Sequence, residues 1–114
     1  MKTILIVDDD LATRDALKEL LKTYGHKIVT ACDGQDAIEW LRSSERPSLI
    51  LLDLSMPRMD GWEFLRHKAI DPLMAAIPTI VLSGSTLDLP EDVRDLLLKP
   101  ADPGRLIALV NQYC

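Results

Sequence analysis

Aromatic residues are scarce in this chain of 114 residues: two tryptophans, two tyrosines and one phenylalanine make up 4% of it. With so few rings, aliphatic side chains must fill the core, chiefly leucine, isoleucine and valine. The sequence also lacks any apolar run of about 18 residues, the length that a membrane span needs, so we expect a cytoplasmic protein without membrane contact. Its length fits one domain covering residues 1–114.

Cysteine is rare, and basic residues are not in excess. Cys32 and Cys114 have neither the density of a disulfide framework nor the spacing of a metal site, so we expect a small buried apolar residue and a terminal thiol. The net charge is −5 and the thirteen lysines and arginines are scattered, so a nucleic-acid backbone would be repelled. We therefore expect no direct binding of nucleic acid.

Short apolar runs alternate with stretches of helical period along the whole chain. This alternation is typical of βα units around a parallel sheet that is buried on both faces. The sequence predicts an α/β fold, a doubly wound five-stranded parallel sheet of the flavodoxin-like (βα)5 type. The expected strands are residues 3–7, 27–31, 49–54, 79–82 and 96–98.

Helical segments are expected between and after these strands. The first ends at Gly25, a suitable C-cap, and the second opens at Asp33 and Gly34. A third is expected over residues 61–67 and a last one after Pro103. The fourth connection leaves only residues 89–95 to be helical, about two turns against a mean of about 11–12 residues. A shortened or remodelled fourth helix is therefore expected.

Polar side chains follow the predicted strands at one edge of the sheet. Because ligands bind at the carboxyl ends of the strands in doubly wound sheets, we expect these groups to converge on one place. Asp10 fits the N-cap of the first helix better than a ligand role and is left out of the set. The candidate residues, in chain order, are Asp8, Asp9, Asp53, Ser83 and Lys99.

The residue types in this set favour phosphoryl chemistry. Several carboxylates at one place repel one another unless a cation neutralises them, and hard oxygen ligands suit Mg²⁺, with Mn²⁺ as an alternative. A lysine ammonium and a serine hydroxyl can hold phosphoryl oxygens. A carboxylate can attack phosphorus and form an aspartyl-phosphate. An aspartate after a single strand usually caps a helix, so the interpretation rests on the joint placement at four strand ends.

Four blocks of the sequence resemble, in order and spacing, the receiver domain of two-component response regulators. They are residues 4–10, 51–61, 80–84 and 98–100. The block around Asp53 is the most specific part, and the resemblance covers essentially the whole chain. It implies a phosphorylation-switched signalling domain that catalyses only its own phosphorylation and autodephosphorylation. The implied partners are a sensor histidine kinase or a histidine phosphotransfer protein, and a downstream protein target.

The resemblance also implies a role for each candidate residue. Asp53 would accept the phosphoryl group, Lys99 would pair with it, and Ser83 would move to hydrogen-bond it. Magnesium would be bound by three carboxylates and one backbone carbonyl, those of Asp8, Asp9, Asp53 and Ser55.

The chain departs from the family at two places that bear on signal output. Leu96 stands where many receivers have an aromatic residue, and the fourth connection is short. A constitutive, phosphate-independent interaction module with the receiver fold therefore stays open as an alternative. A metal-dependent phosphatase with its nucleophile in the Asp8–Asp10 run is a second one, although it leaves Asp53 unexplained. The chain is either a stand-alone receiver or part of a longer protein.

Overall fold

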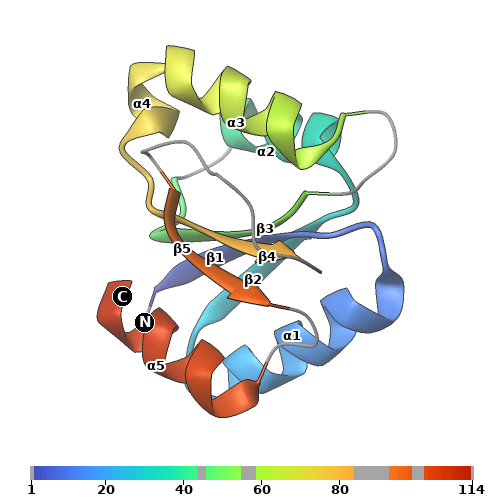
Figure 1. The fold of residues 1–114 in the computed structure, drawn as a ribbon, viewed down its shortest axis with the longest axis vertical. Helices are drawn as coiled ribbons and strands as arrows, with labels where there is room; N and C mark the ends of the chain where they lie inside the picture. Colours follow the sequence, from blue (N-terminus) through green and yellow to red (C-terminus); the bar gives the residue numbers. More distant parts are fainter. Residues whose placement is uncertain (1, 44–45, 55–58, 84–92, 99–101, 114) are drawn as a thin grey trace.

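The computed structural model describes residues 2–43, 46–54, 59–83, 93–98 and 102–113. Its strands form one five-stranded parallel sheet in the order β2-β1-β3-β4-β5 (Figure 1). The predicted doubly wound sheet is thereby confirmed. The strands are β1 (Thr3–Val7), β2 (Lys27–Ala31), β3 (Leu49–Asp53), β4 (Thr79–Ser83) and β5 (Val93–Leu98).

Helices cover both faces of the sheet (Figure 1). On one face lie α1 (Leu11–Thr23) and α5 (Pro103–Tyr113). On the other lie α2 (Gly34–Ser43), α3 (Gly61–Ile70) and the short α4 (Pro72–Ala75). None of the helices in the described ranges is long and apolar enough to cross a membrane.

Successive strand residues supply two separate hydrophobic clusters, because side chains alternate between the faces of a sheet. Ile4 and Ile6 of β1 join the cluster under α1 and α5, whereas Leu5 and Val7 join the cluster under α2, α3 and α4. Strands β3 and β4 are buried along their whole length. The near-continuous apolar runs of the sequence therefore correspond to central strands that are covered on both sides.

Aspartate caps fix where two of the long helices begin. The Thr13 N–H donates to Asp10 Oδ2 over 3.0 Å at the start of α1, which confirms the predicted cap. The Glu63 N–H likewise donates to Asp60 Oδ1 over 2.9 Å at the start of α3. Helix α1 ends before Gly25, whose φ of 88° is a left-handed conformation that glycine adopts without steric cost.

Strands β3 and β4 end within one residue of the expected positions, but other boundaries differ more. The third helix continues to Ile70, and α4 follows it as an unpredicted helix in which Asp71 is the cap and Pro72 the first residue. Strand β5 begins at Val93, so the prediction of helix over 89–95 is wrong for 93–95. Pairing of Val93 with Thr79 of β4 stabilises strand there, which overrides local propensity. The rest of the predicted fourth helix falls outside the described residues.

Cys32 was expected to be buried and is exposed. It comes directly after β2, an edge strand of the sheet, where the chain turns toward α2. The prediction was wrong because a turn beyond an edge strand has no neighbouring strand to cover it. Cys114 lies outside the described residues.

Candidate functional site

The strand register brings the predicted carboxylates together. Val7 pairs with Leu52, so the next residues of the two chain segments, Asp8 and Asp53, emerge at the same sheet edge. Asp53 in turn pairs with Leu82, the residue before Ser83. Residues far apart in the sequence therefore meet because three parallel strands end at the same level.

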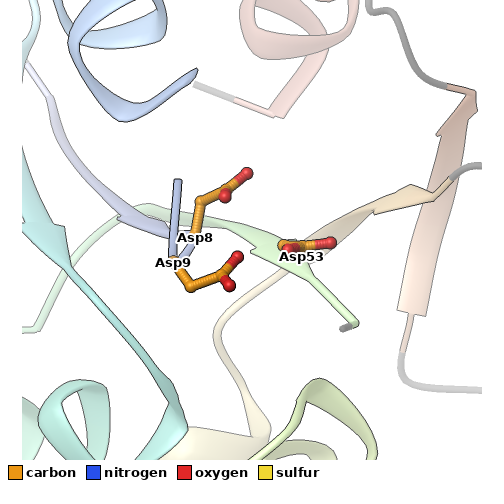
Figure 2. Close-up of side chains that lie close together, drawn as sticks. All are labelled: Asp8, Asp9 and Asp53. Carbon is orange, nitrogen blue, oxygen red and sulfur yellow. The ribbon is translucent and has the colours of Figure 1, made fainter. Parts of the chain in front are cut away.

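Asp8, Asp9 and Asp53 form a compact cluster in which one carboxylate oxygen from each residue lies within 4.8 Å of the others. Figure 2 shows the three side chains at the ends of β1 and β3. Asp8 and Asp53 are buried, with 0% and 5% of their surface exposed, whereas Asp9 is exposed.

This donor set fits a hard divalent cation. Burying two carboxylates side by side is costly unless a positive charge or hydrogen bonds compensate for the lost water. Mg²⁺ takes oxygen ligands, usually one or two carboxylates, and keeps several waters. The exposed Asp9 leaves the cluster a side that opens to solvent, through which water and a substrate can approach.

Hydrogen bonds hold the loop after β1 in place. The Asp8 N–H donates to Ala31 O over 3.1 Å, and Asp8 Oδ1 accepts the Asp10 N–H over 2.9 Å. Arg14 reaches back from α1, and its Nη1 donates to the Asp8 carbonyl over 2.7 Å. No sequence signal marks this contact, because it depends on how α1 returns past the strand end.

Two glycines allow close backbone approaches, that of α3 to the end of β3 and that of α2 to Met59, just before α3. A Cβ at Gly61 would lie 2.6 Å from Leu54 Cα and 2.7 Å from Asp53 O, distances that no side chain can occupy. The Gly61 N–H donates to Leu54 O over 2.9 Å. A Cβ at Gly34 would similarly lie 2.8 Å from Met59 O. Gly61 belongs to the specific block 51–61, so its pattern could have indicated a close backbone approach.

The other predicted site residues are placed as follows. Ser83 ends β4 beside β3 and is 7% exposed. Asp10 lies outside the carboxylate cluster and caps α1, as expected. Ser55 and Lys99 lie outside the described residues, and their predicted roles stay predictions.

Comparison with known proteins gives consistent matches over nearly the whole chain. The family model described as the response regulator receiver domain matches residues 4–111. Protein PilH of Pseudomonas aeruginosa is 33% identical over 119 residues, which cover 97% of this chain and 96% of that protein. An uncharacterized 14.6 kDa protein of Leptolyngbya boryana is 37% identical over 117 residues, covering 97% of this chain and 88% of that protein.

A solved structure agrees with the sequence matches. The signal receiver domain of a signal transduction histidine kinase from Syntrophus aciditrophicus superposes with a TM-score of 0.88 at 30% identity. The match covers 99% of this chain and 89% of that one. Fold and sequence therefore point to the same group of proteins.

Proposed function

Because the chain belongs to the response regulator receiver domain family, we propose that it is a phosphorylation-switched receiver of a two-component system or phosphorelay. It accepts a phosphoryl group on Asp53 from the phosphohistidine of a sensor histidine kinase or phosphotransfer protein. It then signals by contact with a downstream protein. The observation that carries the proposal is the cluster of Asp8, Asp9 and Asp53, with carboxylate oxygens within 4.8 Å, at the carboxyl ends of two strands.

Asp53 is the nucleophile in the proposed reaction. One of its carboxylate oxygens forms the new P–O bond while the P–N bond to the donor imidazole breaks, and the imidazole keeps the bonding electron pair. The protein contributes mainly position and charge, because the transition state of phosphoryl transfer is loose. The hydroxyl of Ser83, at the end of the neighbouring strand, donates a hydrogen bond to a phosphoryl oxygen.

The side chains of Asp8, Asp9 and Asp53 hold Mg²⁺, or Mn²⁺ in its place, in this proposal. When bound, the cation neutralises the carboxylates and stabilises negative charge on the phosphoryl oxygens. The backbone carbonyl of Ser55 as a further ligand is implied by the resemblance to the family. Lys99 as the phosphoryl counter-charge is inferred from its place in the sequence and from the same resemblance. Lys99 directly follows Leu98, the last residue of β5, whose neighbour in the sheet is Ser83.

The two alternatives are less well supported. A phosphate-independent module has no need for three clustered carboxylates, two of them buried, and the cluster is intact. An aspartate-nucleophile phosphatase would act from the Asp8–Asp10 run and leaves unexplained both Asp53 and the family match over residues 4–111.

Intact-mass spectrometry with a small phosphoryl donor tests the acceptor. With acetyl phosphate and Mg²⁺ the wild-type protein should gain one phosphoryl group, and Asp53→Asn should gain none because an amide is not a nucleophile at phosphorus. Asp33→Asn is the matched control. Asp33 is also buried, it follows a strand, and its Oδ1 accepts the Asp36 N–H at the start of α2, a hydrogen bond that an asparagine oxygen can also accept. Labelling of Asp53→Asn at the wild-type level would contradict the assignment.

A titration tests the metal site separately. Asp9→Asn should weaken Mg²⁺ binding by about tenfold or more, because ligand charge sets the affinity of oxygen-ligand sites. Asp9 is exposed, so the variant should fold normally. Asp15→Asn, which removes an exposed charge from α1, is the control. An Mg²⁺ affinity unchanged in Asp9→Asn would exclude Asp9 as a ligand.

A further inference from the structure

The surface formed by α2, α3 and α4 is hollowed. A hollow of about 400 Å³ lies between α2 and the α3–α4 segment and is lined by Ile38, His67, Ile70 and Met74 among others. A second hollow of about 180 Å³ shares Met74 with it, and a third of about 200 Å³ shares His67 and Ile70. The three hollows are therefore neighbours on one surface, and we call them together the α2–α4 groove.

Large apolar side chains stand exposed at the edge of this groove. Ile70 at the end of α3 is 82% exposed, and Leu73 in α4 is 65% exposed. Isoleucine and leucine are normally buried, and apolar groups gathered beside a hollow are typical of binding surfaces. The groove thus offers an apolar floor and two apolar anchors that the fold itself does not use.

The groove is basic on a protein that is acidic overall. The chain has a net charge of −5, yet among the described residues that line the groove the arginines and the histidine outnumber the acidic side chains. Its acidic lining residues are Glu63 and Asp71, and Asp71 Oδ1 already accepts the Leu73 N–H over 3.0 Å. The basic lining residues are Arg42, Arg46, Arg66 and His67.

We propose that the α2–α4 groove binds an acidic amphipathic helix of the downstream partner protein. An amphipathic helix lays its apolar side chains into a hydrophobic groove, here against Ile70, Leu73 and Met74. Acidic side chains on its flanks then face Arg42 and Arg66, which gives the complementarity that selects a partner. The identification of this helix with a downstream target rests on the proposed function.

Two other occupants fit less well. A second copy related by a two-fold axis would place the same patch against itself, and the arginines of the two copies would repel. A membrane surface is flat and leaves hollows unfilled. Three arginines and a histidine are also fewer than the clusters of about 4–8 lysines or arginines that recognise anionic lipids.

Helix α3 connects the groove to the acidic cluster. It begins at Gly61, whose N–H bonds to Leu54 O next to Asp53, and it ends at Ile70 in the groove. The same rigid element therefore contacts the strand that carries the proposed acceptor and the surface that would contact the partner. This continuity is the reason for assigning the groove to a downstream partner.

Synthetic helical peptides test the groove directly. The probe has leucines at i, i+3, i+4 and i+7 and glutamates on the flanks, and a matched peptide carries lysines in place of the glutamates. Fluorescence anisotropy gives the affinities, and NMR shifts of the labelled full chain locate the site. The glutamate peptide should bind, the lysine peptide should bind at least about tenfold more weakly, and the shifts should centre on His67, Ile70 and Met74.

Surface variants distinguish specific from general attraction. The double variant Ile70→Ser with Leu73→Ser should bind the glutamate peptide about tenfold more weakly, because a few anchor side chains carry most of the binding free energy of an interface. Arg42→Glu with Arg66→Glu should reverse the preference between the two peptides. Leu11→Ser with Lys22→Glu removes an exposed leucine and a basic side chain from α1 on the opposite face, and should leave the affinity unchanged.

Each opposite result overturns the proposal. These results are absence of binding by the glutamate peptide, equal binding of both peptides, shifts centred on α1, or unchanged affinity in the Ile70 and Leu73 variant. Self-association that the same variant abolishes would assign the groove to a second copy. Binding to phosphatidylserine vesicles that this variant abolishes, without peptide binding, would assign it to a membrane.

The experiments distinguish an error in the groove proposal from an error in the proposed function. The groove variants should still be labelled by acetyl phosphate, because Asp53 lies at the strand end and not in the groove. Asp53→Asn should lose labelling while it still binds the glutamate peptide. If the wild-type protein binds the glutamate peptide but is not labelled by acetyl phosphate, the proposed function alone is overturned.

Discussion

Helices α1 and α5 cover one face of the sheet with an aliphatic layer, whereas α2, α3 and α4 cover the other face with larger and more varied side chains. Leu21 and Leu106 are typical of the fully buried residues of the first layer. The second layer includes Phe64, the flexible Met74 and, at 0% exposure, Lys68. The described hollows and the tight glycine contacts also lie on this second side.

The two helical layers differ in what their side chains have to do. The α1–α5 layer needs only complementary aliphatic shapes, which fill space without polar groups. On the opposite side, α3 must approach the end of β3 through Gly61, and its far end leaves Ile70 exposed. On that side the same helix therefore combines a tight backbone contact at the acidic cluster with an exposed apolar side chain at its other end.

The largest expected effect comes from removing a large buried side chain on each face. Phe64→Ala should lower the free energy of unfolding by about 3–5 kcal/mol and Leu106→Ala by about 2–5 kcal/mol, because each leaves a cavity. Both residues are 0% exposed. Denaturant unfolding of the two variants measures the loss. A much smaller loss in Phe64→Ala would show that the layer under α3 is loosely packed.

A pair of glycines compares the faces at the backbone level. Gly61→Ala should destabilise by about 1–3 kcal/mol, because its Cβ would meet the backbone of β3. In Gly104→Ala, within α5, the added Cβ would lie 3.4 Å from Asp102 Oδ2, its one neighbour within 4 Å among the described residues, and the variant should gain about 0.5–1 kcal/mol from helix propensity.

The same pair tests the link to the acidic cluster. Gly61→Ala should also weaken Mg²⁺ and beryllofluoride binding, because Asp53 O is among the atoms that must move. Gly104→Ala should bind both as the wild type does. Equal behaviour of the two variants would mean that α3 does not position the acceptor strand.

The buried lysine gives a smaller effect that is confined to one face. Lys68 Nζ donates to Ala75 O at the end of α4 over 3.3 Å. Lys68→Met keeps the apolar stem but leaves this carbonyl without that donor, so we expect a loss of about 1–3 kcal/mol. Amide exchange in α4 should accelerate. Lys22→Met on the exposed side of α1 should change stability by less than about 0.5 kcal/mol.

The helix caps give a small effect, and it should be similar on the two faces, although Asp10 also accepts a hydrogen bond from the Thr13 hydroxyl. Asp10→Ala and Asp60→Ala each remove a side-chain acceptor from a first-turn N–H and should cost about 1 kcal/mol. Thermal unfolding of both variants measures the cost. A clear difference between them would mean that one aspartate also has a role beyond its cap.

Much of the sheet and of the acidic cluster could be predicted because their signals are local. Continuous apolar runs mark buried parallel strands, so the aspartates directly after the first run and at the end of the third must emerge at one edge. The start of β5 and the existence of α4 could not be predicted in this way. Val93 is in a strand because it pairs with Thr79, and α4 follows α3 directly, so periodicity does not separate the two.

The sequence by itself determined the α/β alternation, the buried central strands and the approach of Asp8, Asp9 and Asp53 to one another, because each follows from residue order and side-chain period. The tertiary structure alone decided the contacts that depend on how helices return to the sheet. These include the bond from Arg14 to the Asp8 carbonyl, the close fit of Gly61 against β3, and the α2–α4 groove. Such contacts join segments whose relative placement is set by packing of the whole chain, and no local pattern encodes that placement.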